Sequence, residues 1–468
     1  MNDPRVRRIW SGASAEEVAR DLQPLVDFQD AGLPLEEVEA LVEERLLPHL
    51  CHYDLPSFHS FFNAFPEEGA TYGARVALEW NQGVTNWQVS PGGAVLEELC
   101  CTALCRLFDL GAEAGCTPMY CGTYANQQAI YMALHRKAEM EGFSLPEDGL
   151  QGFEDPSRLA IVTSTEAHFS VKHAARMLGL GERSIVTVGV DENRRMDVEQ
   201  LRETLARLAG AGAGAGAGTD TESRNVVCVS ATAGTTSTGS VDPLGRIAEV
   251  CKEHDVWLHA DGAYGFGYAL VPEWMPLYSG AELADSITWD PHKQFGAPIP
   301  SSIVFARRAE DLYRMAIFSS YFNREDSAEP NPGLKSIPST RPMSALPLAT
   351  SIRYLGISGV IERLRKPLVV IREVFDQLQG QPDMELMHRP DTGILCFRVI
   401  PSGLAEERID ALQQHVYETL LRGGKRSLSI SELDGETCLR IVALSPAVTV
   451  EAVRETLLQV RQIAESFC

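Results

Sequence analysis

The feature that most constrains the fold is an alternation of short β-branched runs with helical patterns, between about residues 90 and 305. The runs are Leu159–Ser164, Ser184–Val188, Asn225–Ser230, Val256–His259, Ser286–Trp289 and Ser302–Phe305. Apolar runs of this length, separated by helices, are typical of a mostly parallel, doubly wound sheet. We therefore predict an α/β fold, with ligands bound beyond the carboxyl ends of the strands.

Amphipathic helices are expected at the start of the chain. Ser14 and Glu17 form a capping box ahead of one apolar stripe, and Pro34 precedes a second stripe that begins at Leu35. Their apolar faces need a partner surface, which a second subunit or the chain's own subunit could equally provide, and we treat them as a dimerisation arm.

Three segments follow from these patterns. Residues 1–80 are expected to form the helical dimerisation segment, residues 81–360 the large α/β domain, and residues 361–468 a small C-terminal α+β domain. The last assignment is based on strand-like stretches near residues 393–400 and 437–443, each followed by a helical pattern.

The acidic composition excludes several classes of partner. A formal net charge of −23 disfavours nucleic acid and anionic membrane surfaces, which bind clustered Lys and Arg. The chain contains no run of 18 or more apolar residues and no apolar leader after its first methionine. We therefore expect a cytoplasmic protein. Its eleven cysteines follow no CxxC spacing, so no metal site is expected.

An alternating Ala-Gly repeat occupies residues 209–218. It could be mistaken for a phosphate-binding loop, but it lacks both the Lys-Ser/Thr pair and the GxGxxG spacing of such loops. We interpret it as a flexible surface linker without a chemical role.

Five short polar segments, which we call stations, lie at or near the ends of the runs. They are Cys121–Asn126, Glu166–Ser170, Thr232–Thr236, His259–Ala263 and Asp290–Lys293. Each station alone has an ordinary explanation, such as a helix cap, a structural polar residue or a surface lysine. Together, and in this order, they predict one polar site at the carboxyl edge of the sheet.

The joint pattern resembles the group II pyridoxal-phosphate-dependent decarboxylases, the family that includes aromatic amino acid, glutamate and cysteine-sulfinate decarboxylases. The resemblance covers most of the chain and includes Pro56–Pro66, Asn86–Pro91 and Leu439–Val442 beside the five stations. The Asp-Pro-His-Lys station, about thirty residues after His-x-Asp-x-Ala, is its most specific part. The resemblance implies an aspartate aminotransferase-like fold (fold type I), pyridoxal 5′-phosphate as cofactor, an amino acid as substrate and a homodimer.

The cofactor has chemical requirements that these stations can meet. Its phosphate needs backbone N–H groups and a hydroxyl at a helix start, which Gly122 and Thr123 provide, and His292 is close enough in sequence to Lys293 to join them. A phosphate is a poor neighbour for the Asp290 carboxylate, so we expect the backbone of that residue to contribute. The pyridine nitrogen needs a buried carboxylate, which we assign to Asp261.

Further roles are implied by the resemblance. Lys293 would bind the cofactor as a Schiff base, His168 would stack on one face of the ring, and Ala263 would pack under the other. Thr232 matches the threonine beside the ring hydroxyl. The family places the substrate carboxylate perpendicular to the ring, near His168, and releases carbon dioxide.

The substrate pocket is expected to involve Asn63, Phe65, Trp87 and Arg440. Trp87 and Phe65 are expected to form its walls, and Asn63 could hydrogen-bond a polar side chain or act only at a turn. Arg440 matches an arginine that binds the substrate carboxylate in glutamate-type members, but an arginine there could also serve packing alone.

The chain departs from the family in the segment after the lysine, where a mobile loop usually carries a tyrosine that reprotonates Cα. Residues 322–353 contain no tyrosine and no histidine; Tyr321 is the nearest candidate, but it aligns better with the preceding helix. Three outcomes follow: His168 or Lys293 supplies the proton and an amine forms, oxygen intercepts the carbanion and an aldehyde forms, or a lyase cleaves another bond.

We place decarboxylation first among these reactions, ahead of aldehyde-forming oxidative chemistry and of a lyase reaction. A cofactor-free scaffold and a plain binding module are disfavoured because Lys293, Asp261 and His168 occur together.

Overall fold

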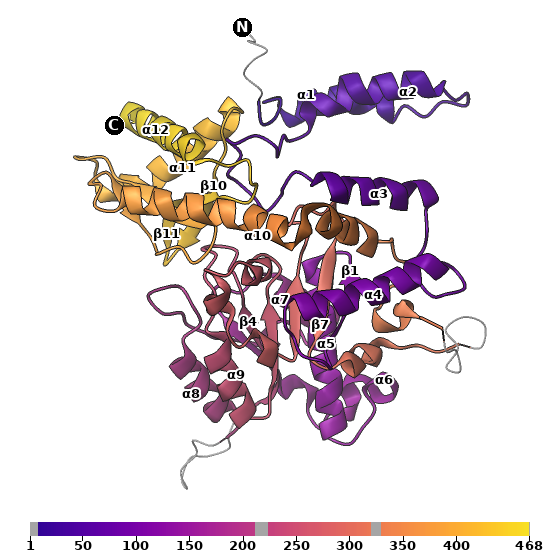
Figure 1. Ribbon diagram of the computed structural model, residues 1–468. Helices are drawn as coiled ribbons and strands as arrows, with labels where there is room; N and C mark the ends of the chain where they lie inside the picture. The colour runs from indigo at the N-terminus through magenta and orange to yellow at the C-terminus, as the bar shows by residue number, and fades with distance from the viewer. Residues whose placement is uncertain (1–7, 211–222, 320–328, 468) are drawn as a thin grey trace. The chain divides into compact units, whose positions relative to one another are not determined.

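The computed structural model describes residues 8–210, 223–319 and 329–467 (Figure 1). The chain divides into two compact units. The smaller unit comprises Met1–Phe65, Lys366–Arg389 and Gly393–Cys468, and the larger comprises Pro66–Arg365 and Pro390–Thr392. Most of the Ala-Gly repeat, from residue 211 onward, and Tyr321 lie outside the described residues.

The larger unit contains a seven-stranded sheet. In spatial order the strands are β1 (Gly115–Met119), β7 (Ser302–Ala306), β6 (Ser286–Trp289), β5 (Trp257–Asp261), β4 (Asn225–Thr232), β2 (Leu159–Ser164) and β3 (Ile185–Val188). Only β7 runs antiparallel to its neighbours, β1 and β6. The prediction of a mostly parallel sheet is confirmed, and each of the runs identified in the sequence forms a strand.

The edge strand β1 was not among the predicted strands. Proline has no N–H to donate to a ladder, so Pro118 weakens the strand pattern in the sequence and is tolerated only at an edge or a bulge. In the structure Pro118 is paired with Ile303 of β7, and its carbonyl accepts a hydrogen bond from Arg341 Nη1 at 3.4 Å. A side chain thus covers part of this edge.

Helices cover the sheet (Figure 1). The helices that lie wholly within the described part of this unit are α3 (Glu68–Trp80), α4 (Pro91–Leu107), α5 (Gly122–Met140), α6 (Leu145–Asp148), α7 (Ser170–Met177), α8 (Val198–Leu208) and α9 (Leu244–Glu253). The long α5 buries Ala125, Ala129 and Ala133, whose small side chains let the helix lie close to the strands. Because α5 starts almost directly after β1, its N-terminus lies at the carboxyl edge of the sheet.

The smaller unit has an antiparallel sheet in the order β10 (Ser429–Leu433), β11 (Glu436–Val442), β9 (Ile394–Val399) and β8 (Met384–Leu386). Asp434 and Gly435 both have positive φ and form the two-residue turn that joins β10 to β11. Helices α11 (Ile409–Gly423) and α12 (Val450–Phe467) belong to the same core. The predicted C-terminal α+β fold is confirmed. Helix α10 (Ala345–Leu378) begins in the larger unit and ends in this one.

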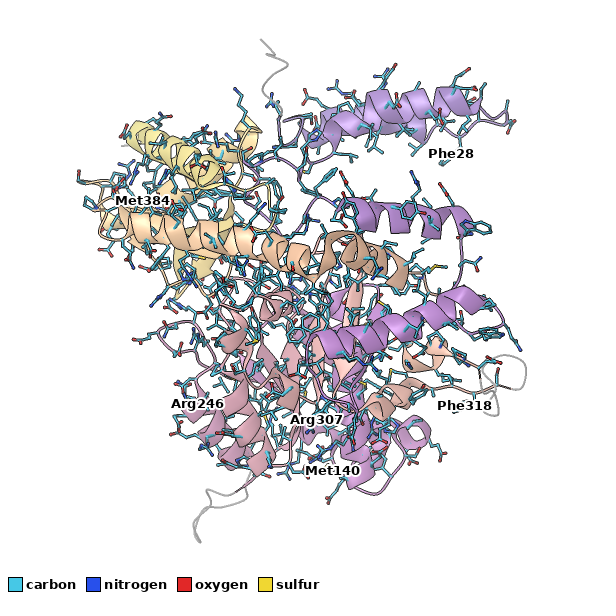
Figure 2. The ribbon with its side chains drawn as sticks, viewed as in Figure 1. Phe28, Met140, Arg246, Arg307, Phe318 and Met384 are labelled. Atoms are coloured by element: carbon cyan, nitrogen blue, oxygen red, sulfur yellow. The ribbon has the colours of Figure 1, made fainter. Side chains whose placement is uncertain are left out.

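The two N-terminal helices are α1 (Ala15–Leu22) and α2 (Leu35–Leu41). The capping box is present: Ser14 N–H donates to the Glu17 carboxylate at 2.7 Å, and Glu17 N–H donates to Ser14 Oγ at 3.3 Å. Neither helix has a buried residue among the described parts of the chain, and Phe28 between them is 89% exposed (Figure 2). The exposed apolar side chains of this segment, such as Phe28 and Leu35, are therefore available to a partner.

Candidate active site

A cavity of about 120 Å³ lies at the carboxyl ends of the parallel strands. Predicted cofactor residues line it, namely Gly122, Thr123, His168, Thr232, Asp261, Ala263 and Lys293. His292 lies beside them, with its Nε2 3.7 Å from the carboxylate of Asp290. The site is assembled from the start of α5 and from the segments that follow β2, β4, β5 and β6.

The start of α5 is closely packed at its first position. A Cβ on Gly122 would stand 2.7 Å from Asp290 Oδ2 and 3.1 Å from the Cβ of Ala263. The backbone at this point is therefore packed directly against the residues that follow β5 and β6. The N-terminus of a 19-residue helix presents unpaired N–H groups and a positive dipole end, which suit an anion.

Asp261 is the last residue of β5 and is 5% exposed. Its Oδ1 accepts a hydrogen bond from the backbone N–H of Ala263 at 3.1 Å, and its Oδ2 accepts one from Asn126 Nδ2 at 2.7 Å. Both oxygens therefore meet donors of the protein, as an ionised carboxylate requires.

Lys293 follows β6, and its Nζ lies 3.3 Å from Asp290 Oδ2. Ser302 Oγ donates to the other oxygen of Asp290 at 2.5 Å. The Asp290 side chain thus faces the lysine, and the expected contribution of its backbone to phosphate binding stays a prediction. Burial lowers the pKa of the neighbouring His292, which keeps that ring neutral at neutral pH.

His168 follows β2 and is half-buried. Burial lowers its pKa, and the nearby Lys293 acts in the same direction, although Asp261 opposes them. The backbone N–H of Ser170 donates to its Nδ1 at 3.2 Å. A neutral ring that accepts at Nδ1 carries its proton on Nε2, so one N–H donor remains for a ligand.

The residues predicted to bind substrate are divided between the units. Trp87 belongs to the larger unit, where its backbone N–H donates to the Pro330 carbonyl at 3.0 Å. Asn63, Phe65 and Arg440 belong to the smaller unit. Phe65 is 56% exposed, whereas Arg440 is 7% exposed.

Arg440 has clear packing contacts within the smaller unit. Its Nε donates to Ser429 Oγ at 2.9 Å on the paired strand, and its guanidinium lies 5.7 Å from the centre of the Phe62 ring.

Sequence reasoning gave no role to several residues that line the cavity, namely Cys121, Asn126, Gly234, Thr236 and Tyr264. A signal existed for Asn126, because it lies four residues after Gly122 and so on the same face of α5. An amide among the buried alanines of that face needs a polar partner.

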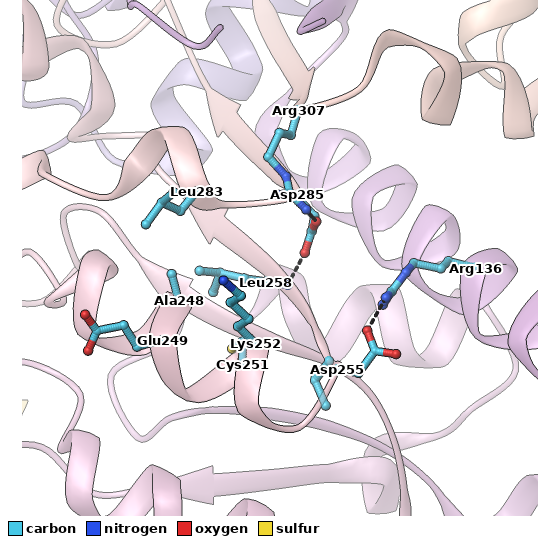
Figure 3. Close-up of a pocket in the computed structure, with 11 residues that line it drawn as sticks. Arg136, Ala248, Glu249, Cys251, Lys252, Asp255, Leu258, Leu283, Asp285 and Arg307 are labelled. Carbon is cyan, nitrogen blue, oxygen red and sulfur yellow. Dashed lines mark hydrogen bonds and ion pairs between the residues drawn. The ribbon is translucent and has the colours of Figure 1, made fainter.

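A second, larger cavity of about 460 Å³ lies at the amino ends of β5 and β6 (Figure 3). Its basic side chains include Arg136, which pairs with Asp255, and Arg307, which pairs with Asp285. The stations identified in the sequence gather at the opposite end of these strands. The smaller cavity is therefore the candidate active site.

Comparison with known proteins agrees with this geometry. Residues 19–400 match the family model described as the pyridoxal-dependent decarboxylase conserved domain, and the chain belongs to this family of pyridoxal-phosphate-dependent amino acid decarboxylases. It is 32% identical to an L-2,4-diaminobutyrate decarboxylase of Acinetobacter baumannii over 82% of this chain and 75% of that protein. A second enzyme of that name, from Rhizobium meliloti, is 29% identical over 96% and 86% of the respective chains.

A solved structure shows the same fold. The glutamate decarboxylase domain of a diaminobutyrate-pyruvate transaminase and L-2,4-diaminobutyrate decarboxylase from Vibrio parahaemolyticus superposes with a TM-score of 0.86. The alignment covers 99% of this chain and 92% of that one, at 24% identity. The predicted fold class is thereby confirmed.

The protein is therefore a carboxy-lyase that uses pyridoxal 5′-phosphate. The cavity fits this cofactor: it combines an open helix N-terminus that a Cβ would obstruct, a buried carboxylate and a lysine amine. None of the helices in the described residues is long and apolar enough to cross a membrane.

The start of α5 provides a first test. We expect Gly122→Ala to weaken binding of pyridoxal phosphate by about tenfold or more, because the added methyl displaces Asp290 or Ala263. Equilibrium dialysis of the apoenzyme measures the affinity. Gly92→Ala is the matched control, since it also lies at the start of a helix but a Cβ there meets nothing within 4 Å. Equal affinities in the two variants would refute close packing around the cofactor at this point.

Proposed function

We propose that the enzyme decarboxylates an L-amino acid, with Lys293 as the residue that binds the cofactor covalently. The observation that carries this proposal is the cavity itself, where the Lys293 amine and the Asp261 carboxylate face the same space as the start of α5. A lysine, a carboxylate and an anion site are the three fixed points that a pyridoxal phosphate ring requires.

The remaining residues are assigned around these points. Gly122 and Thr123 hold the phosphate at the start of α5, with His292 beside them. Ala263 packs under one face of the ring, and His168 covers the other. Thr232, which pairs with Asp261 in the β4–β5 register, lies beside the ring hydroxyl.

When bound, pyridoxal phosphate supplies an electron sink for the charge left at Cα as the carboxylate departs. The chain must orient the substrate and keep the ring nitrogen protonated. Asp261 performs the second task as a buried counter-ion. His168, whose ring is neutral at neutral pH, donates its Nε2 proton toward the substrate carboxylate.

The source of the proton that returns to Cα separates the possible products. No tyrosine or histidine occurs in residues 322–353, so the acid must come from elsewhere. Lys293 and His168, which both line the cavity, are our candidates for this acid. If either delivers it efficiently, an amine forms. If neither does, aldehyde-forming oxidative deamination follows decarboxylation, and a lyase reaction at another bond is the remaining alternative.

The Lys293 assignment predicts a single labelled residue. Borohydride reduction of the holoenzyme should fix a pyridoxyl group on Lys293, and peptide mass mapping identifies the site. Lys293→Ala should abolish the label because the amine is lost. Lys252→Ala should keep it, since Lys252 lines the other cavity. A pyridoxyl group on any other lysine would defeat the assignment.

The missing loop tyrosine predicts a dependence on oxygen. A well-placed general acid contributes on the order of a hundred-fold or more to a proton transfer. If His168 or Lys293 acts in this way, amine should dominate both in air and under argon. If not, aerobic reactions should give aldehyde, ammonia and peroxide beside any amine.

Measurement of amine, aldehyde and carbon dioxide under both atmospheres distinguishes these cases. A product formed without carbon dioxide would overturn decarboxylation but would leave the Lys293 assignment standing.

Asn63, Phe65, Trp87 and Arg440 remain the candidates from the sequence for contacts with the side chain of the amino acid substrate. The names of the similar proteins include diaminobutyrate, aromatic and acidic amino acid decarboxylases, so cationic, aromatic and acidic side chains all belong in the panel for the product experiment. The Arg440 contacts with Ser429 and Phe62 support a packing role, to which carboxylate binding would be an addition.

We also propose a homodimer, in which residues 1–80 act as the dimerisation segment, residues 81–360 carry the cofactor and residues 361–468 form the small domain. The support is the exposed apolar surface of the N-terminal segment, with Phe28 89% and Leu35 69% exposed. In the family that this sequence resembles, the loop that corresponds to Ser336–Arg341 reaches toward the other subunit.

Sedimentation should therefore show a dimer that Phe28→Ser with Leu35→Ser weakens, because burial of both side chains is lost. Leu458→Ser, at an apolar position on α12 that is 55% exposed, should have no effect. A fully active monomer would contradict the dimer.

A further inference from the structure

A continuous chain of buried polar side chains lies behind Asp261. Its members are Trp257, Ser286, His259, Asn126, Asp261 and Ser170, each 5% exposed or less. Three of them alternate along β5, so their side chains lie on one face of the strand. Ser286 is the register partner of His259 on β6. The sequence pattern of β5 and β6 therefore builds most of this chain.

The Asp261 carboxylate can only accept hydrogen bonds, and this fixes which group donates and which accepts along the hydrogen-bonded side chains. Asp261 Oδ2 lies 2.7 Å from Asn126 Nδ2, and only the amide nitrogen can donate to it. Asn126 Oδ1 is then turned to His259 Nε2 at 3.0 Å, so this nitrogen must carry the proton. Burial lowers the pKa of His259 to about 4, so its ring is neutral and Nδ1 is an acceptor.

Trp257, at the other end of this series of hydrogen bonds, requires the same order of donors and acceptors. Trp257 Nε1 can only donate, and it donates to Ser286 Oγ at 2.9 Å. The Ser286 hydroxyl is then free to donate its own hydrogen to His259 Nδ1 at 3.0 Å. An acceptor-only group at one end and a donor-only group at the other leave one consistent arrangement of hydrogens.

Asn126 also connects this chain to His168. The second hydrogen of its Nδ2 points to Ser170 Oγ at 2.8 Å. The backbone N–H of the same Ser170 donates to His168 Nδ1. A single amide therefore contacts the carboxylate assigned to the ring nitrogen and the residue that orients the histidine assigned to the ring face.

We propose that Asn126 and His259 are positioning residues, which hold Asp261 as an oriented, ionised counter-ion of the ring nitrogen and fix His168 as its Nε2–H tautomer. This inference rests on the proposed function, since it takes the roles of Asp261 and His168 from there. His259 acts through Asn126, and Asn126 acts through the two residues that contact the cofactor.

Replacement of Asn126 by leucine tests the proposal. Asn126→Leu keeps the volume but removes both donations, so Asp261 loses a hydrogen bond in a desolvated site. The carboxylate, now less stabilised as an anion, should take up the proton that it shares with the ring nitrogen of bound cofactor, so this nitrogen should be less protonated than in the parent at the same pH, which NMR of isotope-labelled cofactor detects. We also expect kcat to fall about tenfold or more, with a smaller change in KM.

Gln128→Leu is the matched control. Gln128 is a fully buried amide on the same helix, and its Nε2 donates to the Lys335 carbonyl at 2.7 Å, outside the chain described above. Both variants should lower the melting temperature, but only Asn126→Leu should change the NMR titration. Identical titrations in Asn126→Leu and Gln128→Leu would overturn the proposal.

His259 provides a second, independent pair of variants. Gln in place of His259 can present its amide N–H to Asn126 Oδ1, whereas Leu cannot. His259→Gln should therefore restore the parental titration and His259→Leu should not. If both titrate like the parent, the proposal fails even where Asn126→Leu does not fold.

Asp261→Asn separates this proposal from the proposed function. If Asp261→Asn leaves the NMR titration of the ring nitrogen unchanged, the assignment of Asp261 is wrong and the proposal falls with it. If Asp261→Asn shifts the titration and Asn126→Leu does not, the proposed function stands and only the positioning roles are refuted.

Discussion

A buried carboxylate at the end of β5 is the constraint around which the larger unit is arranged. Removal of the Asp261 charge from water is costly unless donors and a cation compensate for it. Backbone and side-chain donors come from Ala263 and Asn126, which lie after β5 and on α5. The Asn126 donation depends on α5 lying close to the sheet, and that approach depends on Gly122 and on the small buried residues of the helix. The packing of α5, the cavity and the hydrogen bonding of Asp261 therefore depend on the same close contacts between this helix and the sheet.

Much of this arrangement could be predicted from residue patterns, because strands of a parallel sheet are buried on both faces and appear as uninterrupted apolar runs. The strands β2 and β6 begin and end at the predicted residues. The capping box at Ser14 was equally visible, since it requires only two residues at a fixed spacing. By contrast, β1 contains Pro118 and pairs with a neighbour on one side only. Its sequence therefore lacks the uninterrupted apolar run that would predict a strand.

Residue patterns indicated several residues that line the cavity, whereas contacts decided by three-dimensional geometry were not visible in the sequence; the roles assigned to the lining residues stay predictions. The buried aspartate of His-x-Asp-x-Ala and the lysine of Asp-Pro-His-Lys do line one cavity. Spacing could not show that Asn126, which lies 135 positions before Asp261, donates to it. Nor could it show which way the Asp290 carboxylate faces, because that depends on Ser302 of β7, 12 positions away.

The Asn126 amide, which lies in the hydrogen-bonded series behind Asp261, limits proton transfer to this carboxylate. Hydroxyls and imidazoles relay protons by accepting one and releasing another, but the nitrogen of Asn126 holds its hydrogens permanently. The carboxylate is therefore insulated from the imidazole of His259, although the two are joined by consecutive hydrogen bonds. Along this path the protein interior can polarise Asp261 but cannot deliver a proton to it. Within the described contacts, proton exchange with the carboxylate is therefore confined to the side that lines the cavity.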